Sequence, residues 1–177
     1  MNKKKYTIAQ ILPALNTGGV ERGVVEISKA LVDNNFKSIV ISSGGYMVSQ
    51  ITRNGGIHYD LDVHTKNPLK WPKIRSDLKK ILEIENVDLI HFCSRAPAWI
   101  GVPLGAILDI PIITSVHMRF RKSNIFKKYY NSILTKGNFI IAISKHIEES
   151  IKSSFPNASG KIKIIHRGVD LDLFNTS

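Results

Sequence analysis

The sequence of 177 residues is long enough to bury a core and fits one domain better than two. With 43% hydrophobic and 22% charged residues, it differs from disordered and fibrous chains. It contains no run of about 18 uninterrupted apolar residues, and the short apolar stretch after its basic start is broken by Gln10 and Pro13. We therefore expect neither a membrane span nor a signal peptide, and a cytoplasmic location. The single Cys93 is expected to be a small core residue and not a catalytic thiol.

The formal net charge of +11 is high for a chain of this length. The positive electrostatic potential of such a protein attracts nucleic acid, anionic lipid and phosphorylated substrates alike. The net charge alone therefore does not identify the partner. No helix-turn-helix, zinc or RNA-binding signature accompanies the charge. A nucleic-acid-binding protein is therefore the weaker alternative, and no nucleic-acid partner is expected.

Apolar runs rich in Ile and Val alternate with longer stretches of helical period. In chain order, we first expect strand 6–12, a helix from Gly19 to Asn34, strand 38–42, helix 48–53, strand 57–61 and a helix from Pro72. Then come strand 87–92, helix 96–108, strand 112–116, a helix through 129–134, strand 139–143, helix 145–154 and strand 163–165. This alternation predicts an α/β domain with a Rossmann-like, doubly wound parallel sheet.

Two details of the helices are predicted from local chemistry. The first helix repeats apolar residues at four- and three-residue steps, and its buried face is expected to contain Val20, Val24, Ile27 and Leu31. The hydroxyl of Ser144 is expected to cap the helix that follows it, because it can accept a bond from an unpaired first-turn amide.

In doubly wound sheets, ligands bind at the carboxyl ends of the strands. The loop after the first strand contains Gly18 and Gly19, whose amides are expected to point outward from a helix start and to favour an anion. A tight turn with no ligand is the alternative. The glycine spacing is not that of dinucleotide-binding folds, and the second strand ends in Ser42-Ser43-Gly44 without the carboxylate that such folds use. A nicotinamide-dependent dehydrogenase is therefore not expected.

The loops after the fourth and fifth strands carry further polar residues. Ser94 and Arg95 follow the fourth strand, and a guanidinium binds phosphate or carboxylate through two parallel bonds. His117 and Arg119 follow the fifth strand, so an imidazole and a cation are expected beside the same crevice. His91, within the fourth strand, has two interpretations: strand packing or a place in the crevice.

Cations alternate with aromatic residues along 119–130. Arg121, Lys122, Lys127 and Lys128 are predicted to form a patch that meets an anionic membrane surface or a phosphorylated glycolipid. A solvated helix face without a partner is the alternative.

With these loops in place, the chain resembles, over nearly its whole length, the N-terminal domain of the retaining, two-domain GT-B glycosyltransferases of family 4. Segment 18–22, Gly-Gly-Val-Glu-Arg, looks like the family's Gly-Gly-x-Glu-Arg loop, and His117 looks like the histidine that closes its fifth strand. Segment 141–144 is similar to the family's Val-Ala-x-Ser segment, and 165–174 is similar to its interdomain hinge. Segment 94–99 is closest to bacterial lipopolysaccharide core glycosyltransferases.

The resemblance implies an enzyme that moves a sugar, with retention, from a nucleotide-sugar donor to a glycolipid or (lipo)polysaccharide acceptor, without a metal or other cofactor. His117 would contact the transferred sugar or the acceptor. The loop beside the donor phosphates and the acceptor would comprise Gly18, Gly19, Glu21 and Arg22. The acceptor-binding residues would be Ser94, Arg95 and Arg119. The enzyme is expected to be peripheral on the inner face of the cytoplasmic membrane.

The resemblance also predicts the domain organisation. An acceptor-side domain is expected at 1–170, and the start of an interdomain hinge at 171–177. In relatives the next domain carries a Glu-x7-Glu motif, and no two Glu residues of this sequence have that spacing. We therefore expect the C-terminal donor domain to be absent from this chain and to be supplied separately for transfer. A catalytically inactive fragment, or an acceptor-binding module without turnover, is the alternative.

Overall fold

The computed structural model describes residues 5–65, 67–120 and 124–168, which form one seven-stranded parallel sheet of order β3-β2-β1-β4-β5-β6-β7. The strands are β1 (Thr7–Ile11), β2 (Lys37–Ser42), β3 (Ile57–Asp60), β4 (Leu89–Phe92), β5 (Ile112–Val116), β6 (Phe139–Ala142) and β7 (Ile162–Ile164). Every adjacent pair is parallel, with β1 paired to both β2 and β4. The predicted α/β, Rossmann-like fold is confirmed.

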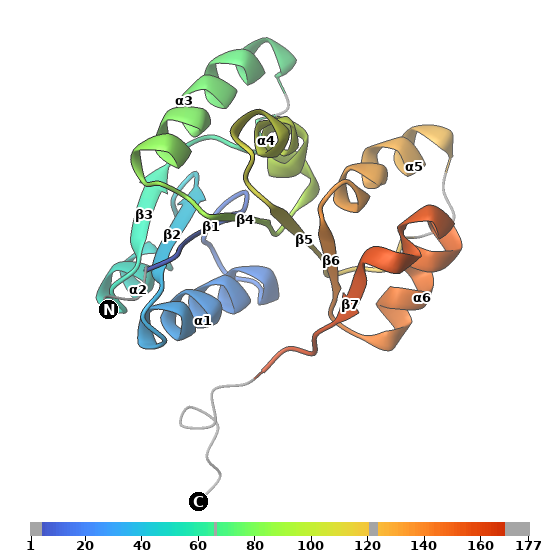
Figure 1. Ribbon diagram of the computed structural model, residues 1–177, viewed down its shortest axis with the longest axis horizontal. Helices are drawn as coiled ribbons and strands as arrows, with labels where there is room; N and C mark the ends of the chain where they lie inside the picture. The colour runs from blue at the N-terminus through green and yellow to red at the C-terminus, as the bar shows by residue number, and fades with distance from the viewer. Residues whose placement is uncertain (1–4, 66, 121–123, 169–177) are drawn as a thin grey trace, which may run out of the picture.

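Helices cover both faces of the sheet. They are α1 (Gly19–Asp33), α2 (Val48–Arg53), α3 (Trp71–Ile84), α4 (Arg95–Leu108), α5 (Ile125–Ser132) and α6 (Lys145–Ser154), with short 3₁₀ turns η1 (Pro68–Lys70), η2 (Ile133–Thr135) and η3 (Pro156–Lys161). Right-handed crossovers place α1 and α2, which lead toward β3, on one face, and α3 to α6 on the other (Figure 1). On the face covered by α1, Ile141 of β6 and Ile165 after β7 line an open cleft beside this helix.

The strand order reverses between β1 and β4. The chain runs outward from β1 to β3, returns to β4 beside β1, and then runs outward again to β7. Loops at the carboxyl ends of β1 and β4 therefore leave toward opposite faces, which opens a crevice at this switch point. The main core lies mostly between the sheet and α3, α4 and α6, around large buried side chains such as Phe92, Leu78 and Ile100.

The predicted buried face of α1 is wrong in part. Val24 is buried as expected, but its buried neighbours are Val25 and Ser28, while Ile27 is 43% exposed. The helix is rotated because it packs mainly against β2, where the Ser28 and Ser38 hydroxyls lie 2.8 Å apart and satisfy each other. Ile27 is consequently free to line an open cleft.

The remaining elements follow their predicted positions closely. The Ser144 hydroxyl accepts a bond of 3.3 Å from the amide of Ile147, so the predicted cap of α6 is confirmed. The predicted helix through 129–134 ends at Ser132 and tightens into η2, which buries Ile133 and Leu134. Within the described part of the chain, no helix is long and apolar enough to cross a membrane.

Candidate active site

An open cleft with a volume of about 400 Å³ lies between α1 and the carboxyl ends of β4 to β7. Its apolar wall is formed by Val20, Val24, Ile27, Ile141, Ile143 and Ile165. Its polar end is formed by His91, Ser115, His117 and Arg167. Of the residues predicted to form the site, His117 therefore lies in the cleft wall, directly beside the start of α1.

His117 is held at the end of β5 by a residue far away in the sequence. Its Nδ1 accepts a hydrogen bond of 2.9 Å from Nη2 of Arg167, which follows β7. Burial, and then the positive charge of Arg167, lower the pKa of His117 to about 4, so the ring is neutral at pH 7. Its Nε2 is buried and has no hydrogen-bond partner among the residues that the structure describes.

His91 and Cys93 form the floor of the polar end. His91 is buried, and its Nε2 lies 2.6 Å from the Ser115 hydroxyl on the neighbouring strand. Burial lowers the pKa of His91 to about 4 and raises the pKa of the Cys93 thiol to about 12. A thiol that stays protonated is a poor nucleophile, so Cys93 is the expected core residue. His91 combines its two interpretations, because it packs within the strand and also lines the cleft.

The glycine loop forms the N-terminus of α1. Gly18 is the N-cap residue and no side chain caps it, while its carbonyl accepts the first helical bond, of 3.0 Å, from Arg22. The Glu21 carboxylate folds back over Gly18, and the Arg22 guanidinium lies 3.4 Å from Glu26 one turn further along. The amides of the first turn are thus available to an anion, but the Glu21 carboxylate lies close to the same helix end.

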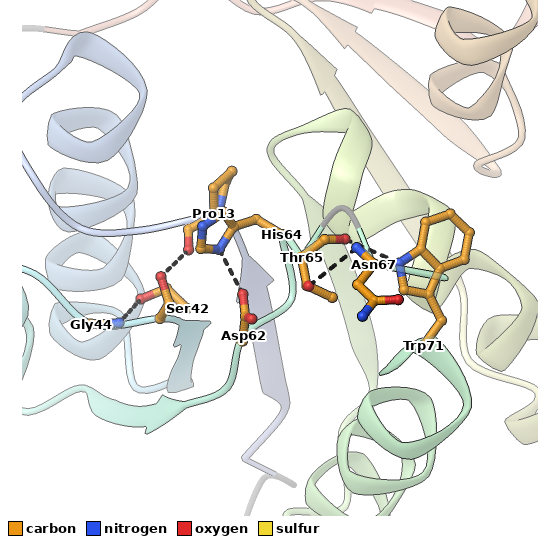
Figure 2. Close-up of polar contacts among 9 residues, drawn as sticks. Pro13, Ser42, Gly44, Asp62, His64, Thr65, Asn67 and Trp71 are labelled. Carbon is orange, nitrogen blue, oxygen red and sulfur yellow. Dashed lines mark hydrogen bonds and ion pairs between the residues drawn. The ribbon is translucent and has the colours of Figure 1, made fainter. Parts of the chain in front are cut away.

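The path of this loop is fixed by the loop after β2 (Figure 2). The Ser43 hydroxyl donates to the Pro13 carbonyl at 2.8 Å. The Leu15 amide donates to the Gly44 carbonyl at 2.7 Å, and Figure 2 labels Pro13, Ser42 and Gly44 where the two loops meet. Gly45, with φ +134°, lies so close that an added Cβ would be 2.5 Å from the Leu15 carbonyl. Only glycine can adopt this positive φ and also lie this close to the Leu15 carbonyl. The Gly44-Gly45 turn therefore positions the chain that leads into α1.

The segment after β3 runs along the same edge of the sheet (Figure 2). The His64 imidazole lies 3.1 Å from the Asp62 carboxylate, and the Trp71 indole donates to the Thr65 carbonyl at 3.1 Å. The Asn67 amide donates to the Thr65 hydroxyl at 3.4 Å. These bonds connect the start of α3 to the segment after β3. They lie outside the cleft, and no pattern in the sequence predicts them.

The predicted acceptor residues are only partly brought together. Ser94 is the half-buried N-cap of α4, and Arg95 begins that helix with a buried Nε that lacks a partner among the described residues. Both follow β4, which is adjacent to β5 and His117 in the sheet. Arg119 is exposed, and none of these three residues lines the cleft. The structure thus places Ser94 and Arg95 at the expected edge and leaves Arg119 on the surface.

The predicted basic patch lies on α5. Lys127 and Lys128 are exposed there, together with Ile125 and Phe126, each 83% exposed. Helix α5 is joined to α4 where Trp99 donates from its indole to the carbonyl of Tyr130 at 3.1 Å. The other two predicted members of the patch, Arg121 and Lys122, lie outside the described residues.

Arg167 is the site residue that the sequence analysis missed. The carboxyl-end rule, applied to β7 as it was to β4 and β5, would have found it. By sequence, segment 165–174 is similar to the family's interdomain hinge. A sequence profile of Glycosyltransferase Family 4 matches residues 17–173, which includes the glycine loop, His117 and Arg167.

The chain belongs to glycosyltransferase family 4. A glycosyltransferase from Rickettsia africae is 35% identical and superimposes with a TM-score of 0.84 over 98% of this chain and 46% of its own. Anabaena HepE, solved with UDP-glucose, is 16% identical with a TM-score of 0.75, over 97% of this chain and 46% of its own. The spore coat protein SA of Bacillus subtilis is 26% identical over 159 residues, which are 89% of this chain and 40% of that protein.

These likenesses confirm the predicted fold as the Rossmann-like N-terminal half of a GT-B architecture. The chain spans less than half the length of each of these three proteins.

Proposed function

We propose that this family 4 domain supports the retaining transfer of a sugar from a nucleotide-sugar to a glycolipid or (lipo)polysaccharide acceptor, with no metal. The observation that carries the proposal is the neutral His117, held at the carboxyl end of β5 beside the uncapped start of α1. A neutral imidazole can donate a hydrogen bond to a sugar or acceptor hydroxyl without competing for the negative charge of a leaving diphosphate. The complex of Anabaena HepE with UDP-glucose supports a donor of this class.

The leaving diphosphate would be stabilised by preorganised backbone dipoles. The amides of Gly18 and Gly19 lie at the positive end of α1, where a helix terminus favours an anion. For a phosphate to bind there, the Glu21 carboxylate must swing away from the helix end. Changing Glu21 to Gln is therefore expected to strengthen diphosphate binding by about two- to fivefold. This factor corresponds to the interaction free energy between one charged side chain and the helix dipole.

The acceptor is proposed to be anionic, as in the phosphorylated core of lipopolysaccharide. Arg95 supports this proposal because its Nε is buried at the start of α4 and unpaired within the described ranges. A bidentate bond to phosphate would satisfy this group. Ser94 offers a hydroxyl at the same helix end, and Arg119 would reach the acceptor from the surface.

The exposed face of α5 is proposed to rest on an anionic membrane from the cytoplasmic side. Ile125 and Phe126 would enter the interface, while Lys127 and Lys128 would pair with lipid headgroups. This placement would bring the domain close to a glycolipid acceptor. A donor-side half is proposed as the further partner, since the Rickettsia africae and Anabaena chains are each more than twice as long as the part that matches this domain.

The proposed function is tested by calorimetry and by an activity assay on matched variants. The chain is titrated with UDP-glucose and with a phosphorylated lipopolysaccharide core, and transfer is followed by mass spectrometry with a donor-side half added. His117→Ala is expected to weaken binding or transfer at least tenfold, whereas His146→Ala, an exposed change on α6, is expected to leave both unchanged. Equal behaviour of the two variants would remove His117 from the site, and ligand binding without any transfer would favour a binding module.

A further inference from the structure

The contact between His117 and Arg167 fixes which ring nitrogen carries the proton. A guanidinium has N–H donors only and stays protonated in proteins. Because Nη2 of Arg167 lies 2.9 Å from Nδ1 of His117, Nδ1 must accept. The single proton of the neutral ring therefore belongs on Nε2.

The Nε2 atom is in turn left without a bond. It is buried, and no acceptor lies within hydrogen-bonding distance among residues 5–65, 67–120 and 124–168. Buried N–H donors are almost always paired in folded proteins. Because His117 lines the open cleft, a ligand oxygen that binds there would supply the missing partner.

Gly19 makes room for the guanidinium. A Cβ added to Gly19 would lie 2.7 Å from Nη1 of Arg167, closer than real Cβ atoms come to other atoms. The bare first turn of α1 thus allows the Arg167 side chain to reach across to His117. Three segments that are remote in sequence, at the starts or ends of α1, β5 and β7, meet in this contact.

We propose that Arg167 is a positioning residue for His117, holding its ring as the neutral tautomer with the proton on Nε2. His117 then presents an N–H donor to an oxygen of the sugar or acceptor in the cleft. This inference rests on the proposed function, and it assigns Arg167 a role that acts through His117.

The electrostatics around His117 agree with this assignment. Burial is the larger cause of its lowered pKa, and the Arg167 charge is the second. The other titratable or charged groups that line the cleft are Glu26, Lys29 and Asp33 of α1, His91 in β4, Cys93 directly after β4, and His166 beside Arg167. Removing Arg167 should therefore raise the pKa of His117, but leave it below 6.5 because the ring stays buried.

Histidine ring ¹⁵N spectroscopy of the 177-residue chain tests the proposal directly. Long-range ¹H–¹⁵N spectra distinguish a protonated from an unprotonated ring nitrogen, and His117→Gln assigns the signals. The wild-type ring is expected to show an unprotonated Nδ1 and a protonated Nε2 at pH 7. A mixed tautomer, or a proton on Nδ1, would overturn the proposal.

Variants then distinguish a specific effect of Arg167 on the His117 ring from a general effect on the folded structure. Arg167→Met is expected to mix the tautomers and to raise the titration midpoint of His117 by about one pH unit. Arg167→Lys should restore much of the wild-type behaviour, and Arg53→Met, a matched change on α2, should alter neither. Gly19→Ala should change the tautomer and the midpoint in the same direction but less, since the new methyl group pushes the guanidinium away from Nδ1 while its charge remains nearby. Wild-type tautomer and midpoint in both Arg167→Met and Gly19→Ala would refute the role.

This readout is independent of catalysis. If the His117 tautomer depends on Arg167 but no ligand shifts the Nε2 signal, the hydrogen bond between Arg167 and His117 is supported and the proposed function fails. If a ligand shifts Nε2 in the wild type, and Arg167→Met weakens that shift together with ligand affinity, the positioning role is supported. Unchanged affinity and an unchanged ligand shift in Arg167→Met would overturn it.

Discussion

Gly101 of α4 lies directly against the ring of Phe92 at the end of β4. A Cβ added to Gly101 would lie 2.5 Å from Cζ of that ring and 3.1 Å from Leu78 Cδ2. Helix α4, which begins at Arg95 and is preceded by its N-cap Ser94, can approach the sheet this closely only because residue 101 has no side chain. The position of the predicted acceptor residues therefore depends on a glycine in the core.

Gly101→Ala is expected to destabilise the domain. The added methyl group overpacks a core in which Phe92 and Leu78 are fully buried, which costs about 1–3 kcal/mol. Urea denaturation followed by circular dichroism measures the change. Gly23→Ala in α1 is the matched control, since an added Cβ there meets nothing within 4 Å, and it should be stabilising by about 0.5–1 kcal/mol. Equal effects of the two changes would show that the contact with Phe92 does not limit packing.

Acid is expected to destabilise the domain through the buried His91 and the partly buried His117. The pKa values of His91 and His117 are about 4 in the folded chain, against 6.5 when unfolded. Between these values the unfolded state binds more protons, so stability is fully present above pH 6.5 and falls as the pH drops toward 4. Each histidine should cost about 2 kcal/mol by pH 5. Denaturation at pH 7 and pH 5 measures this loss.

His117→Gln should remove part of that acid sensitivity, because glutamine does not titrate. His146→Gln, at an exposed position of α6, should leave it unchanged. The same loss between pH 7 and pH 5 in wild type and His117→Gln would contradict the lowered pKa of His117.

Glu85→Gln is expected to weaken the edge of the sheet. The buried Glu85 carboxylate at the end of α3 pairs with Lys37 of β2 and accepts a bond from the Tyr59 hydroxyl of β3. The bond from Lys37, and then that from Tyr59, lower the pKa of Glu85, so this stabilisation is present above pH 4.5 and is lost as the pH falls through the folded pKa. We expect a loss of about 1–2 kcal/mol at pH 7, limited because Lys37 is partly exposed.

Glu83→Gln is the control for this change. Glu83 lies on the same helix, with an exposed side chain 3.6 Å from Lys79, and such surface pairs contribute little. Thermal unfolding of both variants at pH 7 makes the comparison. A Glu85→Gln protein as stable as Glu83→Gln would mean that the carboxylate does not hold β2, β3 and α3 together.

Charge reversal on α5 is expected to reduce membrane binding. Lys127→Glu combined with Lys128→Glu should lower partitioning onto vesicles that contain anionic lipid by about tenfold or more, since each cation near such a surface is worth about 1 kcal/mol. Sedimentation with vesicles measures this binding, with neutral vesicles as the reference. Lys79→Glu combined with Lys80→Glu, on α3, is the matched control. Equal losses from both double variants would indicate a response to net charge and not a docking face.

The sequence by itself determined the elements and their order along the chain. Alternating Ile- and Val-rich strands and helical stretches are local patterns, so elements such as 48–53, 112–116 and 145–154 could be predicted to the residue. Predicting that His117 and the glycine loop share one edge of the sheet was also possible, because parallel strands place their carboxyl ends together.

Only the tertiary structure decided what these residues touch. The bond from Arg167 to His117 joins positions 50 residues apart, and it depends on the relative placement of β5 and β7 and on the bare Gly19. Helix α1 is rotated so that Ile27 is exposed, because the helix packs on β2. The spacing of apolar residues in the sequence does not predict this packing. Local sequence sets backbone preferences, whereas the pKa of a histidine and the lining of a cleft depend on neighbours that the folded sheet brings together.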